Sequence, residues 1–337
     1  MRDYRDISLL GRNSFGLACR AARLVEFESA EELHGLWRDG FFAEQGGWTA
    51  LGGGNNMLFV NDFDGALLHP AGKRITVLSE TSASLRVRVE AGVEWDDFVA
   101  WTVGRGLWGA ENLSLIPGSA GAAPVQNIGA YGAEVKDIIL SVELFLVENG
   151  QTLALAREQC GFGYRDSVFK RALRGRAVIT AVNFELGREP QPNVRYGDME
   201  QEVKRLGGAT LQNVREAVVA IRRRKLPDPA ELGNAGSFFK NPVASAQTAE
   251  RLRAEYPDMP EYPAAEGVKL AAAWLIERAG WKGFRRGAVG VHVGQPLVLV
   301  NYGGATGREI VQLAEDIRSD VEARFGVRLE TEVNIIC

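Results

Sequence analysis

The sequence is poor in the residues that build metal centres and disulfide frameworks. Its 337 residues include three histidines and three cysteines, and both sets are scattered along the chain. No two cysteines form a C-x-x-C pair, which argues against a disulfide framework and a structural zinc site. The scattered histidines likewise argue against a histidine-built metal centre. We therefore expect no metal site and a reducing, cytoplasmic environment.

Long hydrophobic runs and a strong charge of either sign are also missing. The longest apolar stretches, such as LVLVN at 297–301, are far shorter than the roughly 20 residues of a membrane-spanning helix. Charges interrupt the N-terminal segment where a signal peptide needs an apolar core. The net charge of -4 gives no basic field for nucleic acid or an anionic membrane. We expect neither nucleic-acid binding nor membrane insertion, and infer no obligate protein partner.

What remains is the composition of a globular protein with more than one domain. Hydrophobic residues make up 46% and charged residues 24%, and 337 residues exceed what one hydrophobic core usually serves. Residues 84–92 alternate apolar and charged side chains and predict a half-buried strand. Residues 95–106 and 211–229 each show a helical apolar stripe. The mixture predicts an α+β fold, with a domain boundary between residues 200 and 230.

The clearest helical pattern lies near the end of the chain. Residues 305–327 carry an apolar stripe, a capping box at Thr306 and Glu309, and a terminating Gly326. The segment that follows, 328–336, is rich in β-branched residues and predicts a strand.

Two glycine-rich segments have too few large side chains for ordinary packing. The first is GGGNN at 52–56, where free N–H groups could bind phosphate and where a simple turn is the alternative. It is not a Rossmann fingerprint, because Met57 occupies the position of the third glycine. The second is IPGSAGAAPVQNIGAYGAE at 116–134, where small side chains leave room for a flat cofactor. Pro117 excludes a G-x-S-x-G nucleophile elbow there. Together the two segments favour a phosphate-bearing cofactor.

Three charged segments allow two interpretations each. Arg165 beside Asp166 is either an ion pair that supports a turn or a guanidinium aimed at a carboxylate or enolate. The cations of RRRKLPDP at 222–229 suit the C-terminus of a helix and could also attract a polyanionic substrate. Glu330 and Glu332 lie two apart on the predicted last strand, either facing solvent or with one acting as a general acid or orienting one.

Seven segments occur in the order found in one known family and span almost the whole chain. They are GGGNNMLF, IPGSAGAAPVQNIGAYG, YRDSVFK, KLPDP, GNAGSFFKNP, KLAAAWLIERAGWKG and LETEV. The sequence therefore resembles the UDP-N-acetylenolpyruvoylglucosamine reductases, the MurB family of peptidoglycan synthesis. The resemblance implies an α+β fold: a two-subdomain FAD-binding fold of the vanillyl-alcohol-oxidase type plus a C-terminal α+β substrate-binding domain. The implied boundaries are 1–74, 75–224 and 225–337, with the last strand able to return to the FAD domain.

The resemblance also implies the reaction. NADPH gives hydride to N5 of a non-covalently bound FAD and leaves, and the substrate UDP-N-acetylglucosamine enolpyruvate takes its place. Hydride then passes from N5 to C3 of the enolpyruvyl group, and protonation at C2 gives UDP-N-acetylmuramate.

The matched motifs assign catalytic roles to three residues. Hydride arriving at C3 pushes negative charge onto C2 and the adjacent carboxylate, where a fixed cation and an acid lower the barrier most. By the resemblance, Arg165 and Glu332 act there, and Ser237 in GNAGSFFKNP donates the proton to C2. A serine hydroxyl is a weak acid, but an enolate is a strongly basic acceptor, so positioning decides the transfer.

The remaining site residues follow from the same resemblance. Tyr196 matches a tyrosine that covers the substrate diphosphate in the longer form of the family, and the insertion through 245–285 fits that form. Asn55 stands where the family often has serine, which leaves open only the detail of that phosphate contact. The expected substrate contacts are Tyr131, Tyr196, Lys225, Asn241 and Gln295. The expected FAD contacts, mainly through the backbone, are Gly52, Gly53, Gly54, Asn55, Asn56, Pro117, Gly118, Ser119, Gly121, Ala122, Asn127, Gly129 and Ala130.

Two other functions remain as alternatives to the reductase. A flavin oxidase acting on an alcohol would need a different C-terminal domain. A non-catalytic flavin- or nucleotide-sugar-binding protein would keep the glycine segments but would have no reason to keep Arg165, Ser237 and Glu332 together.

Overall fold

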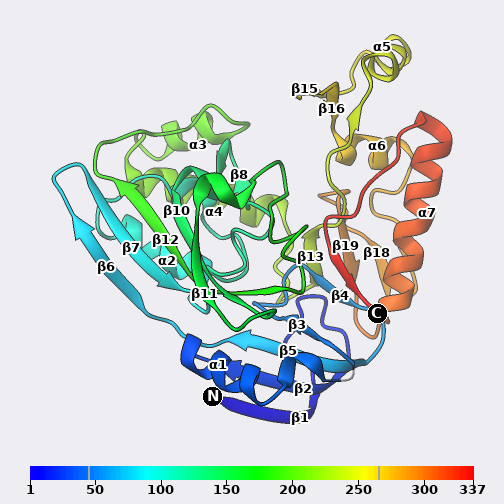
Figure 1. Cartoon of the computed structure of the whole chain (residues 1–337). Coiled ribbons are helices and arrows are strands. Elements are labelled where there is room, and N and C mark those ends of the chain that lie inside the picture. Colours follow the sequence, from blue (N-terminus) through cyan, green and yellow to red (C-terminus); the bar gives the residue numbers. More distant parts are fainter. Residues whose placement is uncertain (45, 265) are drawn as a thin grey trace. The chain divides into compact units, whose positions relative to one another are not determined.

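The chain folds into two compact units, each with its own elements (Figure 1). The computed structural model describes residues 1–44, 46–264 and 266–337. Unit 1 comprises residues 1–7, 21–53 and 64–224, and unit 2 comprises residues 8–20, 54–63 and 225–337. Each unit is thus assembled from segments that are distant in the sequence.

The largest sheet of unit 1 is antiparallel, with the strand order β11-β10-β12-β7-β6 (Figure 1). Val87, Val142 and Val182 are fully buried on one face, where they join an extensive core cluster. The prediction of a half-buried strand at 84–92 is confirmed, since buried and accessible positions alternate along β7. The strands are β6 (Ile75–Glu80), β7 (Ser84–Glu90), β10 (Ile139–Leu146), β11 (Thr152–Ala156) and β12 (Ala177–Gly187).

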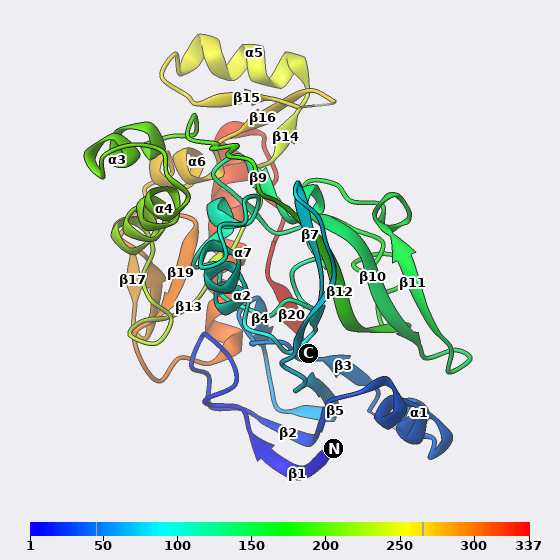
Figure 2. The same ribbon diagram turned by 90° about the vertical axis from the view of Figure 1, so that its left-hand side faces the viewer.

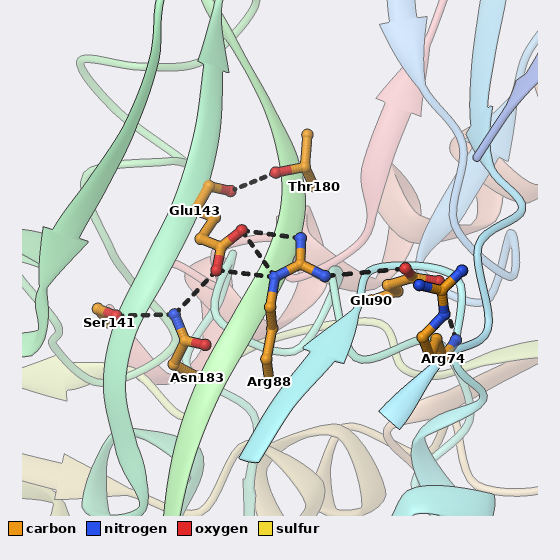
Figure 3. A network of polar contacts seen from close by, with 7 residues as sticks. All are labelled: Arg74, Arg88, Glu90, Ser141, Glu143, Thr180 and Asn183. Atoms are coloured by element: carbon orange, nitrogen blue, oxygen red, sulfur yellow. Dashed lines mark hydrogen bonds and ion pairs between the residues drawn. The ribbon is translucent and has the colours of Figure 1, made fainter. Parts of the chain in front are cut away.

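The opposite face of this sheet carries a polar network (Figure 3). The strand register places Asn183 opposite both Arg88 and Ser141. The Arg88 guanidinium donates to both oxygens of Glu143, with Nε–Oε1 and Nη2–Oε2 distances of 2.9 Å. Asn183 Nδ2 donates to Ser141 Oγ at 3.0 Å. The arginines of the alternating strand, Arg86 and Arg88, are therefore paired with glutamates of other strands, Glu185 and Glu143.

A second sheet of unit 1 has the order β1-β2-β5-β3 and includes a parallel pair, β3 with β5. Its strands are β1 (Arg2–Ser8), β2 (Arg20–Phe27), β3 (Trp48–Ala50) and β5 (Phe63–Pro70). A short pair, β8 (Gly129–Ala130) with β9 (Ala133–Glu134), lies within the second glycine-rich segment.

The helices of unit 1 follow the predicted apolar stripes. Trp95, Phe98 and Val99 are buried on one side of α2. Val214 and Val218 of α4 are fully buried in a cluster shared with α3. The helices are α1 (Ala30–Arg38), α2 (Trp95–Val103), α3 (Met199–Arg205) and α4 (Leu211–Lys225).

The main sheet of unit 2 has the order β13-β19-β18-β17, and α7 packs against β18 and β19 (Figure 1). The predicted capping box and terminator of α7 are confirmed: Thr306 Oγ1 accepts from Glu309 N, and Gly326 has φ +65°. These elements are β13 (Gly233–Ser237), β17 (Arg285–Arg286), β18 (Val289–Val291), β19 (Val298–Asn301) and α7 (Gly307–Phe325).

The rest of unit 2 forms two smaller groups. In the first, α5 lies against a three-stranded sheet ordered β14-β16-β15 (Figure 2). In the second, β4 pairs in parallel with the C-terminal β20. The elements are β4 (Met57–Phe59), β14 (Val243–Ala244), α5 (Ala246–Glu255), β15 (Glu261–Pro263), β16 (Val268–Leu270), α6 (Ala272–Arg278) and β20 (Asn334–Ile336).

The predicted strand at 328–336 is shorter in the structure. Only Asn334–Ile336 forms β20, because the ladder with β4 extends over three residue pairs. The residues before it are held by one isolated bridge, between Thr331 and Phe239.

None of the helices in the described part of the chain combines the length and apolar character needed to cross a bilayer.

Candidate active site

The first glycine-rich segment contacts the second within unit 1. A Cβ added at Gly52 would lie 3.3 Å from Ser119 Oγ and 3.4 Å from Ala122 Cβ, so only glycine fits there without a shift. The Ser119 hydroxyl is buried and has no hydrogen-bond partner among the described residues. A buried, unpaired hydroxyl beside a bare backbone is suited to a polar group of a bound ligand. These residues therefore fit the phosphate-bearing cofactor that the sequence predicts.

Gly54, the last glycine of GGGNN, is needed for a different reason. Its φ is +66°, and an added Cβ would lie 2.1 Å from the carbonyl oxygen of Arg12. Both residues belong to unit 2. Conformation and space each exclude a side chain here.

We expect Gly54→Ala to lower the free energy of unfolding by about 3 kcal/mol or more. Gly16→Ala is the matched control, because Gly16 has φ +65° but nothing within 4 Å of an added Cβ. The control should lose about 1–2 kcal/mol, the strain of the left-handed conformation alone. Urea unfolding of both variants measures the difference. Equal losses of unfolding free energy would show that the Arg12 carbonyl moves aside at little cost.

The second glycine-rich segment is held by Asn127, which is fully buried. Its Nδ2 donates to Glu134 Oε2 and to the Gly163 carbonyl, both at 3.0 Å, and its Oδ1 accepts from Lys136 N at 3.1 Å. Because these three bonds occupy the amide group, the Asn127 side chain stabilises the loop. Any contact of Asn127 with flavin would be made by its backbone.

Arg165 lies beside this loop in an unusual backbone conformation. Its φ is +54°, which is uncommon for a residue with a side chain. Its Nη2 donates to the Gly129 carbonyl at 2.7 Å. The neighbouring Asp166 carboxylate forms an ion pair with Arg171, at 3.1 Å from its Nε. Backbone strain of this kind is found at functional sites, where the surrounding structure enforces it.

Arg222 is the first cation of RRRKLPDP. The sequence indicates this basic run as a whole and does not distinguish Arg222 within it. Arg222 is partly buried, and its Nε donates to the Leu115 carbonyl at 3.2 Å. Burial is the main cause that lowers its pKa, and the charge of Arg165 lowers it further, while Tyr131 and Asp96 act in the opposite direction. Two like charges that repel one another in a partly buried place suit an anionic ligand.

Both backbone polar groups of Leu115, its N–H and its carbonyl, are bound by side chains. It has φ +58°, and its N–H donates to Asp96 Oδ1 at 2.6 Å. Arg215 binds the same carboxylate with two hydrogen bonds of 2.8 and 2.9 Å. Burial by itself raises the pKa of Asp96, but the bonds from Arg215 and Leu115 outweigh it and hold that pKa below its usual value. The ion pair thus supports the entry to the second glycine-rich segment.

Two predicted substrate residues, Tyr131 and Tyr196, meet in unit 1. Their ring centroids are 6.3 Å apart in an edge-to-face arrangement. Tyr131 has φ +49° and a pKa raised mainly by burial, whereas Tyr196 is 53% exposed. An exposed tyrosine beside a partly buried one can change position without disrupting the core.

The predicted proton donor, Ser237, is presented by a β-bulge in unit 2. The register between β13 and β19 shifts between Asn234 and Ser237, and Gly236 in the bulge has φ +69°. Asn234 Oδ1 accepts from Gly236 N at 2.9 Å and fixes the turn. Phe238 and Phe239 are buried and anchor the segment behind it. The bulge therefore holds a partly accessible hydroxyl on a rigid support.

Backbone pairing brings the loop of Ser237 beside Glu332. Glu332 N donates to the Phe238 carbonyl at 2.8 Å, and Lys240 N donates to the Glu330 carbonyl at 2.9 Å. Asn56 Nδ2 donates to the Glu332 carbonyl at 3.2 Å. Two catalytic candidates that are distant in sequence are thereby placed on neighbouring segments of unit 2, beside the end of GGGNN.

The remaining predicted substrate residues have amide or ammonium donors. Asn241 Oδ1 accepts from Ala272 N at 3.0 Å, so the acceptor of this amide is occupied by the backbone. Gln295 Oε1 accepts from Leu297 N at 3.4 Å. Lys225 is exposed at the end of α4. Donors of this kind suit the oxygens of a diphosphate.

Two known domain families match parts of this chain. A model described as "FAD binding domain" matches residues 21–156, and one described as "UDP-N-acetylenolpyruvoylglucosamine reductase, C-terminal domain" matches residues 228–336. The predicted fold class, an α+β FAD-binding fold followed by a C-terminal α+β domain, is confirmed.

Similar solved structures are known. A UDP-N-acetylenolpyruvylglucosamine reductase from Thermus caldophilus superposes with a TM-score of 0.71 at 23% identity over the whole of both chains. A solvent-stable cholesterol oxidase gives 0.51 at 10% identity, covering 96% of this chain and 86% of the other. At these identities the likeness concerns the fold.

Similar sequences extend over nearly the full length. Proteins named UDP-N-acetylenolpyruvoylglucosamine reductase are 45% identical in Bacteroides fragilis, with 98% of both chains covered, and 47% identical in Pseudomonas aeruginosa, with 97% of both covered. The relative from Azoarcus is 48% identical over 97% of this chain and 96% of its own. With the FAD-binding domain and the paired Ser237 and Glu332 segments in place, the chain belongs to the UDP-N-acetylenolpyruvoylglucosamine reductase family of FAD-dependent oxidoreductases.

Proposed function

We propose that this protein reduces UDP-N-acetylglucosamine enolpyruvate to UDP-N-acetylmuramate, with NADPH as the source of hydride, in the synthesis of peptidoglycan precursors. The observation that carries the proposal is the backbone pairing that places the Ser237 loop beside Glu332. A protein that only bound flavin or a nucleotide sugar would have no need for a serine hydroxyl and a carboxylate on those two paired segments.

FAD fits the two glycine-rich segments. The unpaired Ser119 hydroxyl and the bare Gly52 backbone supply a place for its polar groups, and Asn127 keeps the second segment in shape. When bound, FAD supplies the hydride that is added to C3 of the enolpyruvyl group. The remaining FAD contacts are proposed at the backbone of Gly53, Gly54, Asn55, Asn56, Pro117, Gly118, Gly121, Ala122, Gly129 and Ala130.

The cations and the acid stabilise the negative charge that develops at C2 and on the neighbouring carboxylate. We assign Arg165 to this carboxylate, because its guanidinium is anchored at the Gly129 carbonyl and its backbone is held in a strained conformation. Arg222 adds a second positive charge near Arg165. Glu332 is assigned as the acid. Fixed charges of this kind stabilise the transition state without having to reorient.

Ser237 then donates its proton to C2. The bulge, the Asn234 turn and the two buried phenylalanines restrict its motion, which matters more than acidity when the acceptor is an enolate. Lys225, Asn241 and Gln295 are assigned to the diphosphate and uridine, and Tyr131 and Tyr196 to the rest of the bound substrate.

An anaerobic two-step experiment tests the reaction. The purified protein should be yellow, NADPH should bleach it, and UDP-N-acetylglucosamine enolpyruvate should restore the colour. UDP-N-acetylglucosamine, which lacks the enolpyruvyl group, is the control and should leave the flavin reduced. Failure of the substrate to reoxidise the flavin would refute the proposal, and a run with NADH measures the preference for NADPH.

Tyr196→Phe is expected to raise KM for the enolpyruvyl substrate about tenfold, because it removes the tyrosine hydroxyl that is assigned to contact the charged substrate. The rate of flavin reduction by NADPH should change little. Tyr262→Phe is the control, since Tyr262 is also exposed, at 42%, but lies on β15. An unchanged KM in Tyr196→Phe would contradict the assignment.

A further inference from the structure

Asn112 is a buried amide that the reaction itself does not use. It lies in a short 3-10 helix, Glu111–Leu113, and is 2% exposed. Its Nδ2 donates to the carbonyls of Tyr131 and Asn193, both at 2.8 Å. The two bonds use both amide hydrogens, and Oδ1 has no partner among the described residues. The side chain is therefore held by these two carbonyls.

Asn193 makes a return contact to the same loop. Its Nδ2 donates to the Gly132 carbonyl at 3.0 Å. Gly132 has φ +79°, and an added Cβ would lie 2.9 Å from Asn193 Nδ2. Two asparagines thus bind two successive carbonyls, those of Tyr131 and Gly132, and hold Tyr131 at its unfavourable φ of +49°.

The tie also fixes the segment that carries Tyr196. Asn193 precedes Tyr196 by three positions, and Val194 between them packs in the cluster of α3 and α4. On the other side, Gly197 has φ +57° and Met199 is fully buried at the start of α3. The freedom of the exposed Tyr196 is therefore confined to a few residues between two fixed ends.

We propose that Asn112 is a positioning residue that sets Tyr196 over Tyr131 by tying Asn193 to the Tyr131 loop. The inference rests on the proposed substrate-covering role of Tyr196. Without the tie, the segment has more conformations to lose when substrate binds, and this entropy weakens binding. Asn112 touches neither the substrate nor the cofactor in this role.

A double-mutant cycle tests the inference. The oxidised FAD-loaded enzyme is titrated with UDP-N-acetylglucosamine enolpyruvate, and the dissociation constant is read from the flavin absorbance. We expect Asn112→Ala to weaken binding about tenfold in the wild-type background, by the loss of two hydrogen bonds. In the Tyr196→Ala background the same change should have little further effect. Equal weakening in both backgrounds, or none from Tyr196→Ala alone, would overturn the inference.

Asn213→Ala is the matched control. Its Nδ2 also bridges two carbonyls, those of Leu206 and Gly208 at 3.0 and 2.8 Å, but it has no bond to the Tyr131 loop. It should lower stability without changing the dissociation constant. If Asn112→Ala does not fold, Asn193→Ala takes its place in the cycle, because it removes only the bond to Gly132.

Hydrogen exchange separates this inference from the proposed reaction. In the ligand-free enzyme, amides of residues 193–198 should exchange faster in Asn112→Ala than in Asn213→Ala. Unchanged exchange would overturn the positioning role even where the enzyme reduces its substrate normally. Faster exchange in a protein that fails to reduce the enolpyruvyl substrate would support the tie and refute the reaction.

Discussion

Replacing Ser237 by alanine is expected to slow reoxidation of the reduced flavin by the enolpyruvyl substrate about 10²–10⁴-fold, the usual contribution of a positioned general acid. Flavin reduction by NADPH should remain near the wild-type rate, because no proton has to reach C2 in that step. Stopped-flow absorbance under anaerobic conditions measures the two half-reactions separately.

The difference between the rates of the two half-reactions in Ser237→Ala distinguishes a proton donor from a structural residue. Ser245→Ala is a suitable control, since Ser245 is the N-cap of α5 and its loss destabilises the same unit by about 1 kcal/mol. If that variant slowed reoxidation equally, the effect would be one of stability. Equal slowing of both half-reactions in Ser237→Ala would make Ser237 a structural residue of the bulge.

Arg165→Met should slow the substrate half-reaction about 10²–10³-fold, because it removes a preorganised charge where the negative charge of the transition state develops. Methionine is also unbranched at Cβ, so the strain of the positive φ is nearly unchanged. Arg165→Lys should recover part of the rate, since lysine keeps the charge but not the planar fork.

The control for Arg165 comes from the same turn. Arg171 pairs with Asp166 and also donates to the carbonyls of Ser167 and Gly161. Arg171→Met disturbs this turn without removing the proposed catalytic cation and should leave the half-reaction within a few-fold of wild type. A loss as large as that of Arg165→Met would show that the turn, and not the charge, is what the reaction needs.

Local pattern predicted the elements whose partners are near in sequence or whose apolar faces are continuous. The stripe, capping box and terminating glycine of α7 are found where the sequence places them, and so is the alternation along β7. The strand at 328–336 was predicted too long, because its extent depends on how much of β4 is available to pair with it. The local sequence of a strand does not show how long its partner strand is when that partner comes from a distant part of the chain.

The site divides in the same way. The glycine segments, Ser237, Arg165 and Glu332 stand out or are matched by motif, because chemistry demands those residue types. The positive φ of Leu115, Tyr131 and Arg165 could not be predicted, since none of them is a glycine and only tertiary contacts hold them there. Asn112 has no signal in the sequence, and the basic run 222–229 does not show which of its cations is buried, because both properties depend on the surrounding structure.

Local composition and periodicity specify the kinds of residue available for the reaction and most of the helices and strands that carry them. Which of those residues meet depends on the tertiary structure. Backbone hydrogen bonds pair the Ser237 loop with the Glu332 segment, and the side-chain amide of Asn112 binds the carbonyls of Tyr131 and Asn193, so both contacts join segments that are apart in the sequence. The free energy of such contacts depends on the whole fold, so no short stretch of sequence specifies them.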